Sequence, residues 1–185
     1  METDEEIYLR YLMKDEDRDL ETLLARHRNG LLLFLLGFVR NQEDAEDLLM
    51  DTFARLAVDQ PHFEPSRPGS FRNWLYTIGR RNALMQLRKR KLWTVPLNDE
   101  IPAETDLPEI SLLKEERNRK LYQAIAALKP EYRRVLTLLY LEGVSHEEIA
   151  GIMGMNRMQV YNTVKRGKQS LQKTLERMGI TDAGD

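Results

Sequence analysis

Apolar residues recur at helical spacing from the start of the chain. Residues 3–13 carry apolar side chains in i, i+4 relations, and a second apolar stripe runs to about His27, so two amphipathic helices are predicted. Asn29 and Gly30 are expected to interrupt the second helix. Residues 31–39 are apolar nearly all round, and such a helix must be covered on most sides. This segment is the predicted centre of a first domain.

Two further helices are expected on either side of a proline-rich loop. Asn41, with Asp44 three residues later, is expected to cap a helix that continues to about residue 59. Three prolines and a glycine fall within residues 61–69, so this stretch is predicted to be a loop of restricted shape. Ser70 is expected to cap the next helix, which covers residues 71–91.

The middle of the chain marks a domain boundary. Residues 95–110 combine low hydrophobicity, acidic charge and three prolines, which is typical of an extended tether. The chain is therefore divided into a domain of residues 1–94, this linker, a second domain of residues 111–178 and a disordered tail of residues 179–185. No stretch alternates as a strand does, so the fold class is predicted to be all-α with two helical domains.

The second domain has the pattern of two short helices joined by a turn. Pro130 fits the first turn of a preceding helix. Ser145 and Glu148 have capping-box spacing, and Gly154 suits the turn that follows because glycine accepts positive φ. Asn156 can cap the next helix, whose free face is polar and basic. This arrangement indicates a helix-turn-helix with its recognition helix, although an ordinary helical hairpin with a solvated basic face fits the same pattern.

Charge is distributed in blocks that nearly cancel. The formal charge is −2, from 28 basic and 30 acidic residues. Residues 41–64 hold seven acidic side chains and one arginine, whereas residues 71–91 hold seven basic side chains and no acidic one. Such blocks predict one basic and one acidic partner. The acidic block fits a docking face for a basic helix and, equally, a solvated helix start.

Composition indicates the cellular compartment in which the protein is expected. The chain has no cysteine, so it has no disulfide or thiolate metal site, and this fits a reducing environment. Its acidic beginning lacks a basic region followed by an apolar core, so no signal peptide is expected. The longest apolar run, residues 31–39, is too short to span a bilayer. A cytoplasmic protein without membrane insertion is expected.

Groups that could carry catalysis are scarce. The three histidines, His27, His62 and His146, have no acidic or histidine neighbours at ligand spacing, and no glycine-rich phosphate loop or nucleophile elbow is present. His27 is expected to cap a helix end. The chain is therefore not expected to be an enzyme or to bind a metal or cofactor.

Contact with nucleic acid is better supported. The helix of residues 71–91 combines its basic residues with aromatic and amide side chains, and it follows a stiff loop that contains Phe63. Basic side chains neutralise phosphates, and aromatic faces beside a shaped loop can hold bases that have left the duplex. Phe71 and Trp74 are expected in the hydrophobic core instead.

The chain closely resembles the extracytoplasmic-function (ECF) sigma factors of bacterial RNA polymerase. The resemblance covers nearly the whole chain and lies in three stretches in the family's order: EDAEDLLMDTFARL, PGSFRNWLYTIGRRNALMQLRKRK and LKPEYRRVLTLLYLEGVSHEEIAGIMGMNRMQVYNTVKRGKQSL. It implies a promoter-specificity subunit whose first domain binds core polymerase and the −10 element. The second domain would read the −35 element, and the linker would thread toward the active site and RNA exit of the polymerase.

The resemblance also implies three sets of contact residues. The acidic helix would dock on the clamp helices of the largest polymerase subunit through Asp44, Asp47, Leu48, Asp51 and Phe53. The loop of residues 59–70 would capture a flipped −10 base, and the next helix would contact the element through Arg72, Asn73, Tyr76, Thr77, Arg80, Arg81 and Asn82, to which the basic and aromatic pattern adds Phe63 and Arg88. The −35 set is Arg157, Gln159, Tyr161, Asn162, Lys165 and Arg166, with Lys168 on phosphate.

Further partners follow from the same resemblance. They are the flap of the second-largest polymerase subunit, promoter DNA, and an anti-sigma factor that these residues do not identify. The chain departs from the family at Tyr161 and Thr163, where basic residues are common, and at Gly167, where alanine is. Two rival functions are a sigma-like decoy that only binds an anti-sigma factor and a stand-alone helix-turn-helix regulator.

Overall fold

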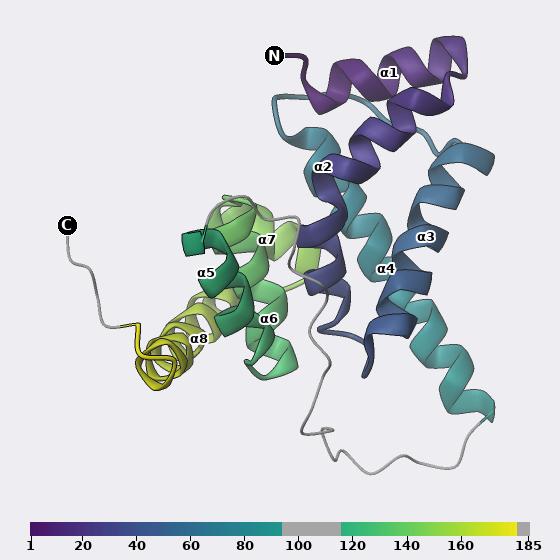
Figure 1. The fold of residues 1–185 in the computed structure, drawn as a ribbon. Coiled ribbons are helices and arrows are strands. Elements are labelled where there is room, and N and C mark those ends of the chain that lie inside the picture. The colour runs from purple at the N-terminus through teal and green to yellow at the C-terminus, as the bar shows by residue number, and fades with distance from the viewer. Residues whose placement is uncertain (94–115, 181–185) are drawn as a thin grey trace.

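Every regular element that the computed structural model describes, within residues 1–93 and 116–180, is a helix. The N-terminal unit consists of α1 (Asp4–Lys14), α2 (Asp17–Leu35), α3 (Gln42–Val58) and α4 (Ser70–Trp93). The C-terminal unit consists of α5 (Glu116–Ala126), α6 (Pro130–Leu136), the π-helix η2 (Thr137–Leu141), α7 (His146–Met153) and α8 (Arg157–Arg177). Figure 1 shows the C-terminal unit lying against α2. The all-α prediction is confirmed. The expected linker, residues 95–110, lies outside the described residues, as does the tail beyond residue 180.

Four predicted helix starts are confirmed, three of them by side-chain caps. Asn41 Oδ1 accepts a hydrogen bond from the Asp44 amide at 2.8 Å, and Pro130 is the first residue of α6. Ser145 forms the predicted capping box with Glu148, and Asn156 forms a second one. Caps of this kind satisfy backbone N–H groups that have no partner within the helix. The helix-turn-helix of α7 and α8 therefore starts where its local chemistry predicted.

The predicted interruption at Asn29 and Gly30 is wrong, because α2 continues through both residues. A glycine inside a helix costs about 1 kcal/mol relative to alanine. Here a Cβ at Gly30 would overlap the carboxylate of Glu142 and the hydroxyl of Tyr76. Gly30 therefore marks a close approach between the units and not a helix end.

Two predicted caps are also wrong. His27 lies within α2, not at its end, and its Nε2 is 2.7 Å from Asp4 Oδ2 in α1. Ser70 is the first residue of α4, and the carboxylate of Glu5 occupies the capping position there, since it accepts a hydrogen bond from the Phe71 amide at 2.9 Å. Helix α1 therefore holds the start of α4.

The hydrophobic core runs through both units. Residues 31–39 are buried as predicted, and their apolar side chains, except that of Leu33, pack with residues of α6, η2, α7 and α8 in one continuous cluster. Leu33 of α2 belongs to the cluster that α5, α6 and α8 build around Leu136 and Leu171. The apolar segment is therefore covered partly by the other unit. Within residues 1–93 and 116–180, no helix is long and apolar enough to cross a membrane.

Candidate nucleic-acid and polymerase interfaces

The recognition helix α8 presents one face to its own unit and the other to solvent. Val160, Val164 and Leu171 are buried against the rest of the unit. Gly167 is buried too, and a Cβ there would lie 3.2 Å from Leu136 Cδ1, so the glycine lets α8 approach α6 closely. The outward face contains all seven residues of the predicted −35 set, each with an exposed side chain: Arg157, Gln159, Tyr161, Asn162, Lys165, Arg166 and Lys168.

Two residues of this set also have local structural contacts. Gln159 Oε1 accepts a hydrogen bond from the Asn156 amide at 2.9 Å and so completes the cap of α8. Arg157 lies 3.6 Å from Glu147 in α7, in a fully solvated pair. An ion pair of this kind contributes little to stability, so it leaves the arginine available to another anion.

The predicted −10 set divides into three groups in the structure. Arg81 and Arg88 are exposed on α4. Arg72, Asn73, Thr77 and Arg80 are half-buried, and the C-terminal unit lies beside this part of α4. Phe63, Tyr76 and Asn82 are buried.

The expectation that all three buried residues face DNA is corrected by their packing. Asn82 lies between α3 and α4, and its Nδ2 donates to Thr52 Oγ1 at 3.3 Å. The ring of Tyr76 packs edge-on against Phe34, with centroids 5.1 Å apart. Phe63 belongs to an aromatic cluster, described next. In this arrangement, Asn82 and Tyr76 pack inside the protein instead of presenting a surface, whereas one side of Phe63 lines the pocket of the loop.

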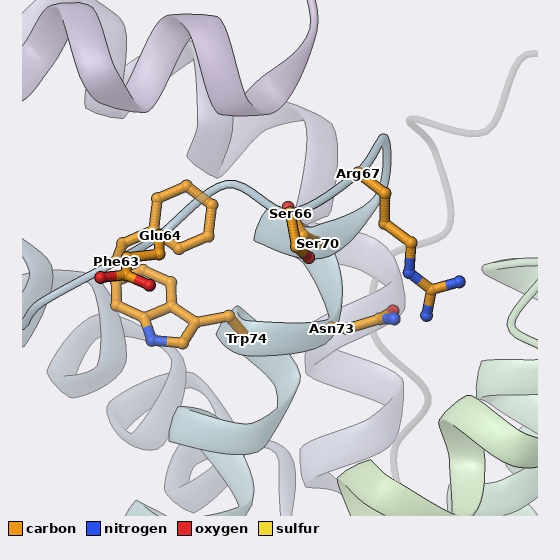
Figure 2. A pocket seen from close by; sticks show the side chains of 7 residues that line it. All are labelled: Phe63, Glu64, Ser66, Arg67, Ser70, Asn73 and Trp74. Carbon is orange, nitrogen blue, oxygen red and sulfur yellow. The ribbon is translucent and has the colours of Figure 1, made fainter.

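The proline-rich loop and the start of α4 line an open pocket of about 270 Å³. One wall is aromatic: the ring centroids of Phe63 and Trp74 lie 4.9 Å apart, and both pack on Tyr8 of α1. Figure 2 shows Arg67 and Asn73 on the other side, pointing toward the ribbon of the C-terminal unit. The full lining is Phe63, Glu64, Ser66, Arg67, Ser70, Asn73 and Trp74.

Glu148 of α7 reaches this polar wall from the other unit. Its Oε1 accepts a hydrogen bond from Asn73 Nδ2 at 2.9 Å and lies 2.8 Å from Arg67 Nη2. The pKa of Glu148 is lowered, because its carboxylate accepts a hydrogen bond from the Ser145 amide in the capping box and also contacts Asn73 and Arg67. An ionised carboxylate therefore occupies the place where the pocket offers a cation and an amide.

A second contact joins α4 to the segment before α7. Arg72 Nη1 donates to the backbone oxygen of Glu142 at 2.7 Å. The side chain of Glu142 lies against Gly30 and Tyr76, and burial there raises its pKa above the ordinary value of 4.5. Burial disfavours the charged form of a carboxyl group. Closing the units therefore carries an electrostatic cost at this residue.

The end of α2 forms a third contact with the C-terminal unit. Arg133 is buried, and its Nη1 donates to the Leu36 backbone oxygen at 2.9 Å. The guanidinium of Arg134 lies 4.6 Å from the ring centroid of Phe38. Gly37, between these two residues of the first unit, leaves room for the side chain of Arg134. Together the three contacts hold the units in what we call the closed arrangement.

The predicted polymerase-docking set on α3 is only partly at the surface. Asp47 and Asp51 are exposed, but Leu48 and Phe53 lie in the core of their own unit, with 1% and 5% of their surface exposed. They cannot anchor a partner without unfolding α3. Asp44 is half-buried, and its carboxylate forms two hydrogen bonds with Arg90 of α4, at 2.6 and 2.8 Å, which lower its pKa.

One exposed apolar residue of this face was not predicted from the sequence. Met50 is 55% exposed and lies on α3 between Asp47 and Asp51. The exposure of Met50 could have been predicted from helical periodicity, because this residue falls outside the buried stripe of Ala45, Leu48, Leu49 and Leu56. An exposed methionine between two carboxylates combines an apolar anchor with charge.

Family models match both units in the same order. The Sigma-70 region 2 model matches residues 23–92, from within α2 to near the end of α4, and the Sigma-70 region 4 model matches residues 118–171, which include the helix-turn-helix.

Three proteins with similar sequences are named as RNA polymerase sigma factors. The ECF RNA polymerase sigma factor SigE of Mycolicibacterium smegmatis is 30% identical over 159 residues, which cover 84% of this chain and 61% of that protein. The RNA polymerase sigma factor CarQ of Myxococcus xanthus is 32% identical over 160 residues, 84% of this chain and 88% of that one. YlaC of Bacillus subtilis, also an RNA polymerase sigma factor, is 29% identical over 167 residues, 88% and 95% of the two chains.

Two solved structures share the fold. The sigma factor RpoE in complex with the anti-sigma factor NepR from Bartonella quintana superposes with a TM-score of 0.58 at 24% identity, over 86% of this chain and 98% of that one. CnrH in complex with the cytosolic domain of CnrY gives a TM-score of 0.59 at 21% identity, over 95% of this chain and 99% of that one.

The two sigma regions match in the order of the family, and the second contains the exposed helix α8. The chain therefore belongs to the ECF family of RNA polymerase sigma factors, which are regulatory DNA-binding proteins and not enzymes.

Proposed function

We propose that this sigma factor directs core polymerase to promoters by placing α8 in the major groove of the −35 element and α4 with its loop at the −10 element. The exposed polar and basic face of α8 carries the proposal. In a helix-turn-helix the N-terminal part of the recognition helix contacts base edges, and Tyr161, Asn162 and Lys165 belong to that part. We retain the division into domains of residues 1–94 and 111–178 as part of the proposal.

At the −10 element, the pocket beside α4 is proposed to receive one extruded base. An aromatic wall suits stacking of any base, and an amide with a guanidinium opposite can bind its polar edge. Arg72, Arg80 and the exposed Arg81 and Arg88 would neutralise phosphates along α4. We leave Asn82 out of the contacting set because it is buried inside its own unit. We leave Tyr76 out as well, because it is fully buried and its ring packs against Phe34.

The closed arrangement has to open before the pocket can receive a base. Glu148 already binds Arg67 and Asn73 there, so DNA and the C-terminal unit compete for the same side chains. The isolated chain should therefore have little affinity for a promoter. Core polymerase would hold the units apart and present both to DNA, which raises the effective concentration of each site for the other.

Docking on core polymerase is proposed to use the exposed face of α3. Asp47 and Asp51 provide negative charge for a basic partner helix, and Met50 provides an apolar anchor between them. Clamp helices of the largest subunit are the proposed partner of this face, and the flap of the second-largest subunit is the proposed partner of the C-terminal unit.

An anti-sigma factor is proposed as a further partner. The support is the shared fold with RpoE and CnrH, each solved in a complex, the former with the anti-sigma factor NepR. A decoy that only binds such an inhibitor would have no use for seven exposed residues on α8. A stand-alone regulator would not need the acidic and apolar face of α3.

Run-off transcription with core polymerase on genomic fragments tests the proposal. Replacing Lys165 with alanine should weaken −35-dependent promoters, whereas Lys173→Ala, an exposed lysine on the same helix beyond the recognition part, should not. Charge reversal of Asp47 and Asp51 should abolish transcription and co-purification with core, unlike reversal of the exposed Asp17 and Glu21. If Lys165→Ala leaves the set of active promoters unchanged, the assignment of α8 is refuted.

A further inference from the structure

The outward face of α8 includes two large apolar side chains among its polar ones. Met158 is 65% exposed and Tyr161 is 57% exposed. Residues three apart on a helix are neighbours on its surface, so the two side chains form one apolar edge. Isolated exposed hydrophobic residues are common in proteins, but here two adjacent ones lie on the face proposed to enter DNA.

The fold does not require apolar residues at these two positions. The inward face of α8 is filled by Val160, Val164 and Leu171. The capping box between Asn156 and Gln159 sets the start of the helix and so fixes the direction of Met158. The apolar edge therefore lies at the N-terminal end of the recognition helix for reasons other than packing.

We propose that Met158 and Tyr161 read the C5-methyl group of a thymine in the −35 element. This inference rests on the proposed function of α8. The thymine methyl is the apolar group that a base pair presents in the major groove, and it distinguishes T·A from the other pairs by contact with apolar side chains. Methionine suits such a contact because its flexible, polarisable side chain adapts to an irregular surface.

The neighbouring residues fit the same placement. Asn162 is exposed beside the apolar edge and can pair with adenine, and the exposed Lys165 and Arg166 can pair with guanine. The cations also attract the phosphates on either side of the groove. The apolar edge is thus surrounded by groups that recognise nucleic acid. A patch of the same size that bound a protein would not require such neighbours.

Helix geometry sets the distance between the two readouts. Seven residues separate Met158 from Lys165, which is about 10 Å along the helix at about 1.5 Å per residue. A recognition helix lies along the inclined major groove, where residues three or four apart contact successive bases. The thymine should therefore lie about two base steps from the base that Lys165 contacts.

The test uses the full chain with core polymerase and a promoter selected from a library randomised at its −35 element. Each thymine of the selected element is replaced in turn by deoxyuridine, which removes only the methyl group. Loss of one buried methyl contact should lower run-off transcription about fourfold at one position. In the double variant Met158→Ala/Tyr161→Ala, the thymine and deoxyuridine templates should give equal transcription. Met13→Ala, at a 78% exposed methionine of α1, is the matched control and should keep the fourfold difference.

Two results would overturn the inference. One is a −35 element in which no thymine can be distinguished from deoxyuridine, and the other is a double variant that keeps the full difference. Co-purification with core polymerase confirms that the variant is folded and docked. If Lys165→Ala also leaves −35 dependence intact, the proposed function fails. If only the methyl effect is missing, the proposed function stands and this inference fails.

Discussion

Gly37→Ala should open the closed arrangement. Gly37 follows α2 in the N-terminal unit, and a Cβ there would overlap the aliphatic part of Arg134 in α6 and lie 3.0 Å from the Phe34 backbone oxygen. Its φ is not in the left-handed region, so alanine causes no backbone strain. The added methyl group therefore acts as a wedge between the units.

The magnitude follows from how little Arg134 can move. The overlap is with the middle of its side chain, whose Nε donates to the Pro130 backbone oxygen at 3.2 Å and whose guanidinium stacks over Phe38. Forcing an extra methyl group into a packed contact costs about 1–3 kcal/mol. The overlap with Arg134 exists only when the units are closed, whereas the contact with the Phe34 oxygen is present in both arrangements. The closed population should therefore fall roughly five- to hundredfold relative to the open one, at about 1.4 kcal/mol per factor of ten.

Intramolecular energy transfer measures this equilibrium directly. The chain has no cysteine, so cysteines introduced at Met13 and Lys173, both exposed and one in each unit, accept a dye pair without side reactions. Gly151→Ala is the matched control, since a Cβ there meets nothing within 4 Å. Transfer efficiency should drop for Gly37→Ala and stay at the wild-type value for Gly151→Ala.

Gly37→Ala should also bind single-stranded DNA more tightly. With the units apart, Arg67 and Asn73 are released from Glu148, so affinity for a single-stranded −10 oligonucleotide should rise in parallel with the loss of transfer. Equal transfer efficiency in the wild type and Gly37→Ala would refute the argument that close packing at this turn holds the units together.

Three further outcomes are expected. Burial raises the pKa of Glu142 above 4.5, so the contribution of this residue favours closure most below that pH and is lost as the pH rises through the raised pKa; energy transfer should fall over this range in the wild type and less in Glu142→Gln. Glu5→Ala leaves the buried Phe71 amide without its acceptor and should lower the free energy of unfolding in urea by about 1–3 kcal/mol, with partial recovery in Glu5→Gln. Met50→Ala should weaken binding to core polymerase by about 1.5 kcal/mol in a titration in which Met13→Ala has no effect.

Local chemistry explains the features that the sequence determined by itself. The capping boxes of Ser145 and Asn156, the turn at Gly154 and the periodic apolar positions involve residues only three or four apart. These local interactions determine where the helices start and end without contacts from distant segments. The all-α class, the helix-turn-helix and the exposed polar face of its second helix could therefore be predicted without the tertiary structure.

The packing of distant segments decided the rest. Gly30 reads locally as a helix break, yet it lies within α2 where Glu142 approaches. Ser70 is of a residue type that often caps helices, yet the carboxylate that caps α4 belongs to Glu5 of α1. Whether Tyr76 faces DNA or another helix depends on which surface covers it, and that surface belongs to residues far along the chain. A side chain's type limits what it can bind, but only the tertiary structure supplies its partner.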